Sequence, residues 1–239
     1  MISENTSKII KRHKRDMKRL FGIDVEEEME VLPSMHWTPK KHKKTSKARF
    51  IIAAKRCSSK KLAQDLTKIL KMFYKQVENY HQKSHFFSNV KHFWVVKNKD
   101  PVVDALKKLN LRNNAKSVAT YDFSTLYTKI PYGDLKDVLN EITDFCFNGC
   151  PDSKIQIDGY EAHWCHNPDS KINCKNNLMD KMKVKNAISY LLNNCYFTIG
   201  KHIFKQVIGI PMGTDPAPIM ANLFLYFYES KFLKTIKKN

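Results

Sequence analysis

Apolar residues recur at intervals of three and four in several parts of the chain, which is the period of amphipathic helices. The clearest case is 62–77, where Lys68, Lys71 and Lys75 fall on the opposite, polar face. Residues 216–232 are apolar on nearly every side, so we expect a buried helix there, with Asp215 capping its amino end. The other predicted helices are Lys8–Arg19, a segment after Asp100-Pro101, 135–145 and 187–192.

Runs of β-branched and aromatic residues predict only a few short strands. Phe50–Ile52, flanked by cations, and Val118–Phe123 are two such runs, and both look fit for burial. Cys195–Ile199 and His202–Val207 flank Gly200-Lys201, a two-residue turn that predicts a hairpin. Residues 148–177 are polar and turn-rich, so we expect an irregular connection there. Helices that alternate with few, separated strands indicate an α+β or α/β class.

The composition is that of a folded protein. The chain has 239 residues, of which 42% are apolar and 11% aromatic, enough for one large domain or two small ones. Seven glycines, nine prolines and the lack of a repeat period exclude collagen-like, solenoid and propeller architectures. No apolar stretch is long enough to span a bilayer, and the first residues are basic. We therefore expect an intracellular protein without a membrane partner; its oligomeric state stays unknown.

The net charge of +19 indicates a polyanionic partner, with nucleic acid as the first candidate. Residues 1–75 hold 20 of the 42 basic residues but only 8 of the 23 acidic ones. The first basic run, Lys8–Arg19, is either a nucleic-acid-binding helix or simply a solvated face or localisation signal. The second, Lys40–Lys61, has ten basic residues and no acidic one around a predicted strand. Such a segment favours contact with phosphate groups.

A single acid, Asp122, lies inside the apolar run Val118–Phe123. A carboxylate in a buried strand is costly unless it is paired, hydrogen-bonded or bound to a metal. Because a Ser-Thr turn follows, we expect Asp122 near the carboxyl end of the strand, where α/β folds place ligands. One carboxylate there suits Mg²⁺. From this segment alone, an aspartate that caps the following turn is an equally good interpretation.

Six cysteines in a chain of this kind are expected to be reduced thiols. One metal-like cluster lies in the turn-rich segment, but its spacing lacks the paired short loops of a structural zinc site. Scattered thiols are therefore the favoured interpretation. The cluster consists of Cys146, Cys150, His163, Cys165, His166 and Cys174.

Several segments together resemble the reverse transcriptases of Penelope-like retroelements. Motif A of that family is similar to the segment 121–131, Tyr-Asp-Phe-Ser-Thr-Leu-Tyr-Thr-Lys-Ile-Pro, in which Tyr127 follows Asp122 by five residues. Its fingers motifs resemble 39–60, and its motif B resembles 204–222, which contains Gly-Ile-Pro-Met-Gly at 209–213. These motifs keep the family's order within residues 33–232.

The resemblance implies an α+β fold of the right-hand polymerase type and RNA-directed DNA synthesis. It makes Asp122 the catalytic ligand of Mg²⁺ or Mn²⁺, and Tyr127 the gate beneath the sugar of the incoming nucleotide. Gly209 and Gly213 would let the backbone approach the nascent base pair, or serve as turn residues. The other predicted nucleotide-binding residues are Arg49, Lys40, Lys55, Met212 and Gly213. The cations predicted to bind nucleic acid are Lys43, Lys44, Lys47, Arg56, Lys60 and Lys61.

By this resemblance the chain has a basic helical extension (1–38), a fingers-like region (39–117) and a partial palm (118–239) with an insertion at 148–177. The implied partners are an RNA template and a DNA primer, with a deoxynucleotide triphosphate in the intact parent, and the implied location is nuclear or ribonucleoprotein-associated. No Asp-Asp pair occurs anywhere, so the paired-aspartate motif of the palm is missing.

We therefore predict a reverse transcriptase fragment that binds nucleic acid but is catalytically incomplete by itself. The metal is expected only where the complete palm is present. The alternative is a noncatalytic, basic nucleic-acid-binding remnant of a retroelement. A third possibility is a product whose incomplete sheet leaves it unstable.

Overall fold

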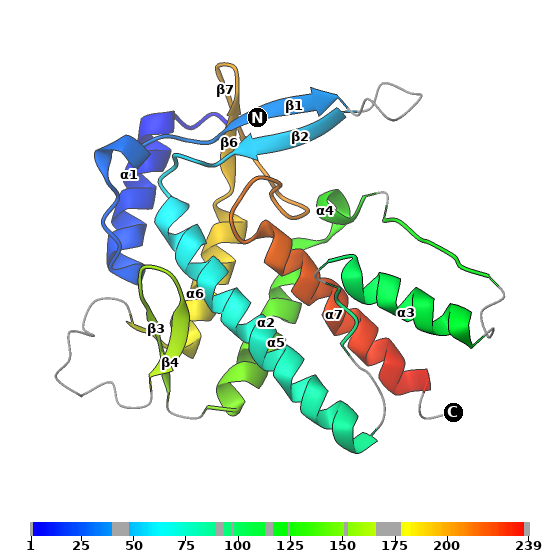
Figure 1. The fold of residues 1–239 in the computed structure, drawn as a ribbon. Coiled ribbons are helices and arrows are strands. Elements are labelled where there is room, and N and C mark those ends of the chain that lie inside the picture. Colours follow the sequence, from blue (N-terminus) through cyan, green and yellow to red (C-terminus); the bar gives the residue numbers. More distant parts are fainter. Residues whose placement is uncertain are drawn as a thin grey trace.

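The structure is a computed structural model that describes residues 2–39, 48–88, 93–96, 98–112, 117–123, 125–150, 153–165 and 178–236. Over these residues the fold is α+β, as predicted, with seven α-helices and two small sheets (Figure 1). The helices are α1 (Thr6–Asp16), α2 (Lys60–Ser88), α3 (Asp100–Leu111), α4 (Leu126–Lys129), α5 (Tyr132–Asn148), α6 (Lys181–Asn193) and α7 (Ala217–Ile236). No helix in this part of the chain is long and apolar enough to cross a membrane.

One sheet has four strands in the order β2 (Ala48–Ala53), β1 (Ser34–Pro39), β6 (Tyr196–Ile199) and β7 (His202–Lys205). The pairs β1–β2 and β6–β7 are antiparallel, whereas β1 and β6 are parallel and share the single register pair Ser34–Thr198. The predicted hairpin at Gly200 is confirmed, and its φ of +56° explains the glycine. In Figure 1, β1 and β2 form a two-stranded ribbon that extends away from the helices.

The main core forms around α2, whose predicted apolar stripe is confirmed. Leu62, Leu66, Ile69 and Phe73 are fully buried and pack with residues of α5, α6 and α7. Helix α7 is buried along one side only, through Ala217, Met220, Ala221, Leu223 and Tyr226, and its distal end leaves Phe232 64% exposed. This core contains residues from all three sequence regions, so the fingers-like and palm-like segments share one interior.

The segment 148–177 was expected to be irregular, and this expectation is wrong for part of it. It contains β3 (Lys154–Ile157) and β4 (Ala162–Cys165), which form a three-stranded antiparallel sheet with β5 (Leu178–Met179). Only two apolar residues, Ile155 and Ile157, point from β3 into the core, too few to give a recognisable alternation. The strands are held instead by packing on α2, where Trp164 stacks on Phe73 at 6.2 Å. Residues 166–177 lie outside the described residues.

The predicted buried strand Val118–Phe123 is also wrong. Residues 117–123 are irregular and exposed, with Tyr121 94% and Phe123 64% accessible. A β-branched, aromatic run becomes a strand only where a neighbour completes its backbone hydrogen bonds, and no described strand pairs with this one. Phe50–Ile52 does form β2, but only Ile52 is buried; Phe50 is 56% exposed because the ribbon projects from the core.

The amino-terminal basic helix is confirmed as α1, and its buried face lies against the four-stranded sheet. Ile9 and Ile10 pack with Tyr196 and Ile203, and the helix continues into a π-helical turn, η1 (Met17–Phe21). His13 is only 2% exposed, and its Nδ1 lies 2.7 Å from the Ser58 hydroxyl oxygen. Burial, reinforced by Arg12, lowers the pKa of His13 to about 4, so the imidazole is neutral in the folded protein.

We predict that the free energy of unfolding falls as the pH is lowered from 6.5 to about 4. In this window unfolded His13 binds a proton that the folded protein excludes, so stability is complete above the unfolded pKa and decreases below it. The loss is at most roughly 3 kcal/mol. Urea denaturation at several pH values gives the slope of the unfolding free energy against pH, and this slope should be smaller in His13→Gln than in wild type. His202→Gln, at an exposed histidine, should keep the wild-type slope; an unchanged slope in His13→Gln would contradict the prediction.

Candidate functional site

The loop 206–216, between β7 and α7, is hydrogen-bonded to two segments that lie far from it in sequence. The Gly209 N–H donates to the Ile130 carbonyl at 2.8 Å, and the Ile210 N–H donates to the Tyr127 carbonyl at 2.7 Å. On the other side of the loop, the Ile52 N–H donates to the Met212 carbonyl at 2.8 Å. The candidate motif B therefore lies against both the candidate motif A and strand β2 of the fingers-like region.

Two glycines make this close packing possible. Gly209 has a φ of +82° and Gly213 a φ of +99°, a region that L side chains rarely adopt. A Cβ at Gly209 would overlap the Tyr127 carbonyl oxygen and come within 2.9 Å of the Thr128 Cα. A Cβ at Gly213 would overlap the Ile52 carbonyl oxygen. In this structure the close approach at both glycines is therefore to the protein's own backbone.

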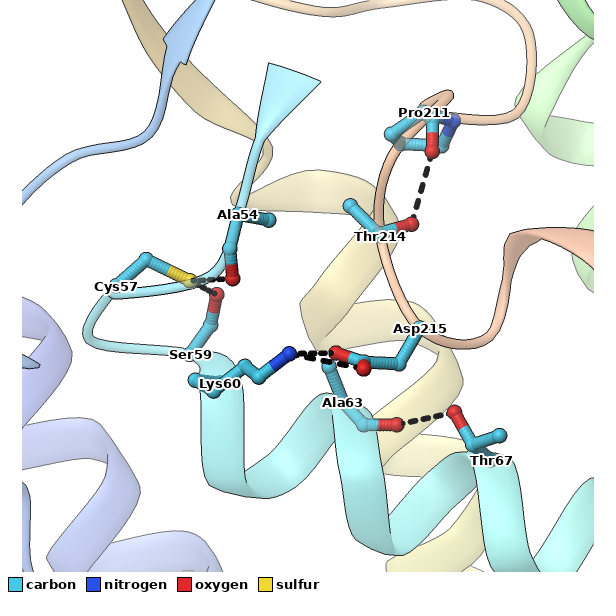
Figure 2. A network of polar contacts seen from close by, with 9 residues as sticks. All are labelled: Ala54, Cys57, Ser59, Lys60, Ala63, Thr67, Pro211, Thr214 and Asp215. Carbon is cyan, nitrogen blue, oxygen red and sulfur yellow. Dashed lines mark hydrogen bonds and ion pairs between the residues drawn. The ribbon is translucent and has the colours of Figure 1, made fainter. Parts of the chain in front are cut away.

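An ion pair ties the same loop to the start of α2. Both carboxylate oxygens of Asp215 accept hydrogen bonds from the Lys60 ammonium, each at 2.8 Å (Figure 2). The side chains are 19% exposed for Lys60 and 27% for Asp215, so water screens the pair only in part. Figure 2 also shows Cys57, whose thiol lies 3.7 Å from both the Ala54 carbonyl oxygen and the Ser59 hydroxyl oxygen; of these residues only Lys60 bonds to the loop.

This pairing changes the interpretation of both residues. Asp215 was expected to cap α7, but its carboxylate accepts from Lys60, and the turn before the helix is closed by Thr214 instead. The Ala217 N–H donates to the Thr214 carbonyl at 3.3 Å, and the Thr214 hydroxyl donates to the Pro211 carbonyl at 2.8 Å. Lys60, predicted to bind nucleic acid, has its ammonium engaged by a carboxylate. Sequence spacing carries no signal for a pair this far apart.

Asp122 lies in the irregular segment before α4, and not at the carboxyl end of a strand as expected. It is exposed and borders an open hollow of about 430 Å³. Among the described residues no hydrogen bond or ion pair holds its carboxylate. The hollow is lined by Asp122, Phe123, Thr125, Leu126, Lys129, Ile130, Pro131 and Phe224.

Tyr127 is held more firmly than Asp122. It belongs to α4 and packs against the main core, and its burial raises the pKa of the phenol. Its carbonyl accepts a hydrogen bond from the Ile210 N–H, which holds the backbone at Tyr127 against the loop. Met212 is half-buried in the loop, and Gly213 is exposed.

The predicted phosphate-binding cations divide into three groups. Arg49, Lys55 and Arg56 are exposed on and after β2. Lys61 is half-exposed and lies 3.2 Å from the Asp65 carboxylate, so it is partly neutralised, as Lys60 is by Asp215. The remaining candidates, which lie outside the described residues, are Lys40, Lys43, Lys44 and Lys47.

The described residues do not fit a metal ion by themselves. They contain no group of three or more histidine, cysteine, aspartate or glutamate side chains placed to hold one. Asp122 supplies a single carboxylate, whereas a two-metal site needs several. The thiol of Cys146 is buried in the core, which raises its pKa, while Cys150 and Cys165 are partly exposed. His166 and Cys174 lie outside the described residues.

No family model matches this chain, and no curated protein matches it significantly.

We predict that Gly209→Ala and Gly213→Ala each lower the free energy of unfolding by about 2 kcal/mol or more. The strain of a positive φ and the overlap of the new Cβ with backbone atoms both contribute to this loss. Gly133→Ala is the matched control, since a Cβ there meets nothing within 4 Å and the residue lies in the first turn of α5. It should be neutral or stabilise by up to ~1 kcal/mol. Chemical denaturation measures all three; equal effects would exclude the close packing of the loop.

We also predict a coupling energy of about 1–2 kcal/mol between Lys60 and Asp215. The ammonium bonds to both carboxylate oxygens, and the two side chains are mostly buried from water. A double-mutant cycle with Lys60→Gln and Asp215→Asn measures it. Lys18 and Asp24, whose side chains are 63% and 78% exposed, form the control pair. Their coupling should be below ~0.5 kcal/mol. Similar values for the two pairs would contradict the prediction.

Proposed function

We propose that this chain is the nucleic-acid-binding part of an RNA-directed DNA polymerase of the reverse transcriptase type, as found in Penelope-like retroelements. The observation that carries the proposal is the convergence of the three segments with family-like motifs. The loop at 209–213 is hydrogen-bonded to the Tyr127–Ile130 turn on one side and to Ile52 of β2 on the other. A right-hand polymerase needs its fingers, motif A and motif B together around one nucleotide.

The charge distribution supports the same proposal. Arg49, Lys55 and Arg56 are exposed within the stretch 31–64, which contains no acidic residue. Unneutralised cations at this density favour phosphate groups, either of a template strand or of a nucleotide triphosphate. An RNA template and a DNA primer are therefore the proposed partners, with a deoxynucleotide triphosphate as the substrate of the intact parent.

The roles of the site residues follow from their placement. Tyr127, fixed by the core and by the loop, is suited to act as a rigid wall beneath a sugar. Asp122 borders an open hollow and offers one carboxylate. Because a single carboxylate cannot hold two metal ions, we propose binding without polymerisation for this chain alone, and we assign no step to Mg²⁺ or Mn²⁺. The metal belongs to the proposal only together with carboxylates from elsewhere.

The alternative is a noncatalytic nucleic-acid-binding remnant. It is favoured by the exposed, unpaired state of residues 117–123, which leaves Asp122 without the rigid support that a catalytic group needs. The two proposals agree on binding and differ only on whether Asp122 serves a nucleotide.

The proposed binding predicts a salt-dependent affinity for single-stranded RNA. Replacing Arg49, Lys55 and Arg56 together by glutamine should lower the slope of log Kd against log salt by about 2, because each lost phosphate contact removes roughly 0.7. The control replaces Arg112, Lys107 and Lys108, three exposed cations on and just after α3, and should leave a larger slope. Fluorescence anisotropy measures both; no RNA binding by wild type would overturn both proposals.

A second measurement separates the two proposals. Binding of a deoxynucleotide triphosphate in Mg²⁺ that Asp122→Asn abolishes and Asp104→Asn preserves favours a nucleotide site; Asp104 is likewise exposed, on α3. RNA binding that both variants preserve, with no nucleotide binding, favours the remnant. In primer extension we expect no product above background, and processive synthesis lost in Asp122→Asn would contradict catalytic incompleteness.

A further inference from the structure

Two large aromatic side chains stand exposed on the β1–β2 ribbon, where no part of the described chain covers them. Trp37 is 64% and Phe50 56% accessible. They are register partners, directly opposite each other on the two antiparallel strands. Directly opposed residues point to the same face of a sheet, so both side chains project from one face of the ribbon.

These rings continue an apolar sheet face that starts inside the protein. The next register pair on this face, two residues inward, is Met35–Ile52. Ile52 is buried together with Phe197 of β6, and Met35 packs against the same cluster. This buried inner end anchors the ribbon, so Trp37 and Phe50 project from a structured sheet and not from an irregular loop.

The charge around the ribbon says what kind of partner fits. The stretch 31–64 has no acidic residue. Arg49 alternates onto the opposite face of the ribbon, next to Phe50, and Lys55 and Arg56 follow the inner end of β2. Exposed rings on a strongly basic element match a ligand that carries both flat π-faces and regular negative charge.

We propose that Trp37 and Phe50 form a stacking platform for unpaired bases of a single-stranded nucleic acid, with Arg49 of the ribbon and Lys55 and Arg56 just after β2 as the nearby cations. Stacking needs only the faces of the bases, so it requires a single strand and tolerates any sequence. In a duplex the base faces are stacked inside the helix, so only the phosphates remain accessible to the ribbon. The proposal rests on the nucleic-acid binding proposed above and adds where and how an unpaired strand is held.

The test compares a short oligothymidylate with an abasic oligonucleotide of the same length and charge. Wild type should bind the oligothymidylate more tightly. Trp37→Ala and Phe50→Ala should each weaken this binding by about tenfold and leave abasic binding nearly unchanged, because one base stack is lost. Both residues are exposed, so the variants should keep the wild-type thermal unfolding midpoint. Tyr160→Ala is the control, since Tyr160 is 93% exposed in the β3–β4 turn of the other sheet.

A spectroscopic readout makes the assignment independent of affinity. Oligothymidylate should quench the fluorescence of Trp37, and Trp37→Phe should lose this quenching while keeping nearly wild-type affinity, because phenylalanine still stacks.

Three outcomes would overturn the platform. The first is equal affinity of wild type for the two oligonucleotides, and the second is unchanged base dependence in both alanine variants; in either case the proposed nucleic-acid binding stands. The third is that Trp37→Ala and Phe50→Ala bind oligothymidylate as wild type does but lose a wild-type ability to bind anionic lipid vesicles or to self-associate. This result would assign the rings to a membrane or to a protein partner. Failure of wild type to bind any oligonucleotide would overturn the platform and the proposed function together.

Discussion

The arrangement of the candidate site depends on one steric constraint, the backbone-to-backbone approach of the loop 206–216 at Gly209 and Gly213. At these positions the loop lies against Tyr127–Thr128 on one side and Ile52 on the other, in conformations that only glycine adopts without strain. The hydrogen bonds from Gly209, Ile210 and Ile52 close around this contact. This contact is what holds the ribbon and α4 against the loop that leads into α7.

Electrostatics reinforces the same junction. In a chain with a net charge of +19, most cations repel one another, yet Lys60 is placed on Asp215 with two short hydrogen bonds. The pair places one acidic residue at the junction between α2 and the loop, while Arg49, Lys55 and Arg56 lie exposed nearby in sequence. The same part of the chain therefore holds both the ion pair that fixes the loop and exposed cations that can bind phosphate groups.

Sequence alone predicted the elements that local periodicity determines. The long stripe of α2 and the glycine turn at Gly200 are encoded within a few residues, and both were found. The strand expected at 118–123 and the strands missed within 148–177 depend on partners far away in sequence, which periodicity does not see. For the site, the sequence identified Gly209 and Gly213 but not what they approach, and it identified Lys60 and Asp215 but not their pairing.

The parallel pairing of β1 with β6 also determines the order in which this molecule can be assembled. During synthesis, α1 and the ribbon emerge long before Tyr196–Ile199, the strand on which both depend. The buried face of α1 and the inner end of the ribbon therefore stay uncovered until β6 has been made, a non-local topology that slows folding. Meanwhile, the excess of lysines and arginines in residues 1–75 makes unfinished chains repel one another, and such repulsion opposes aggregation.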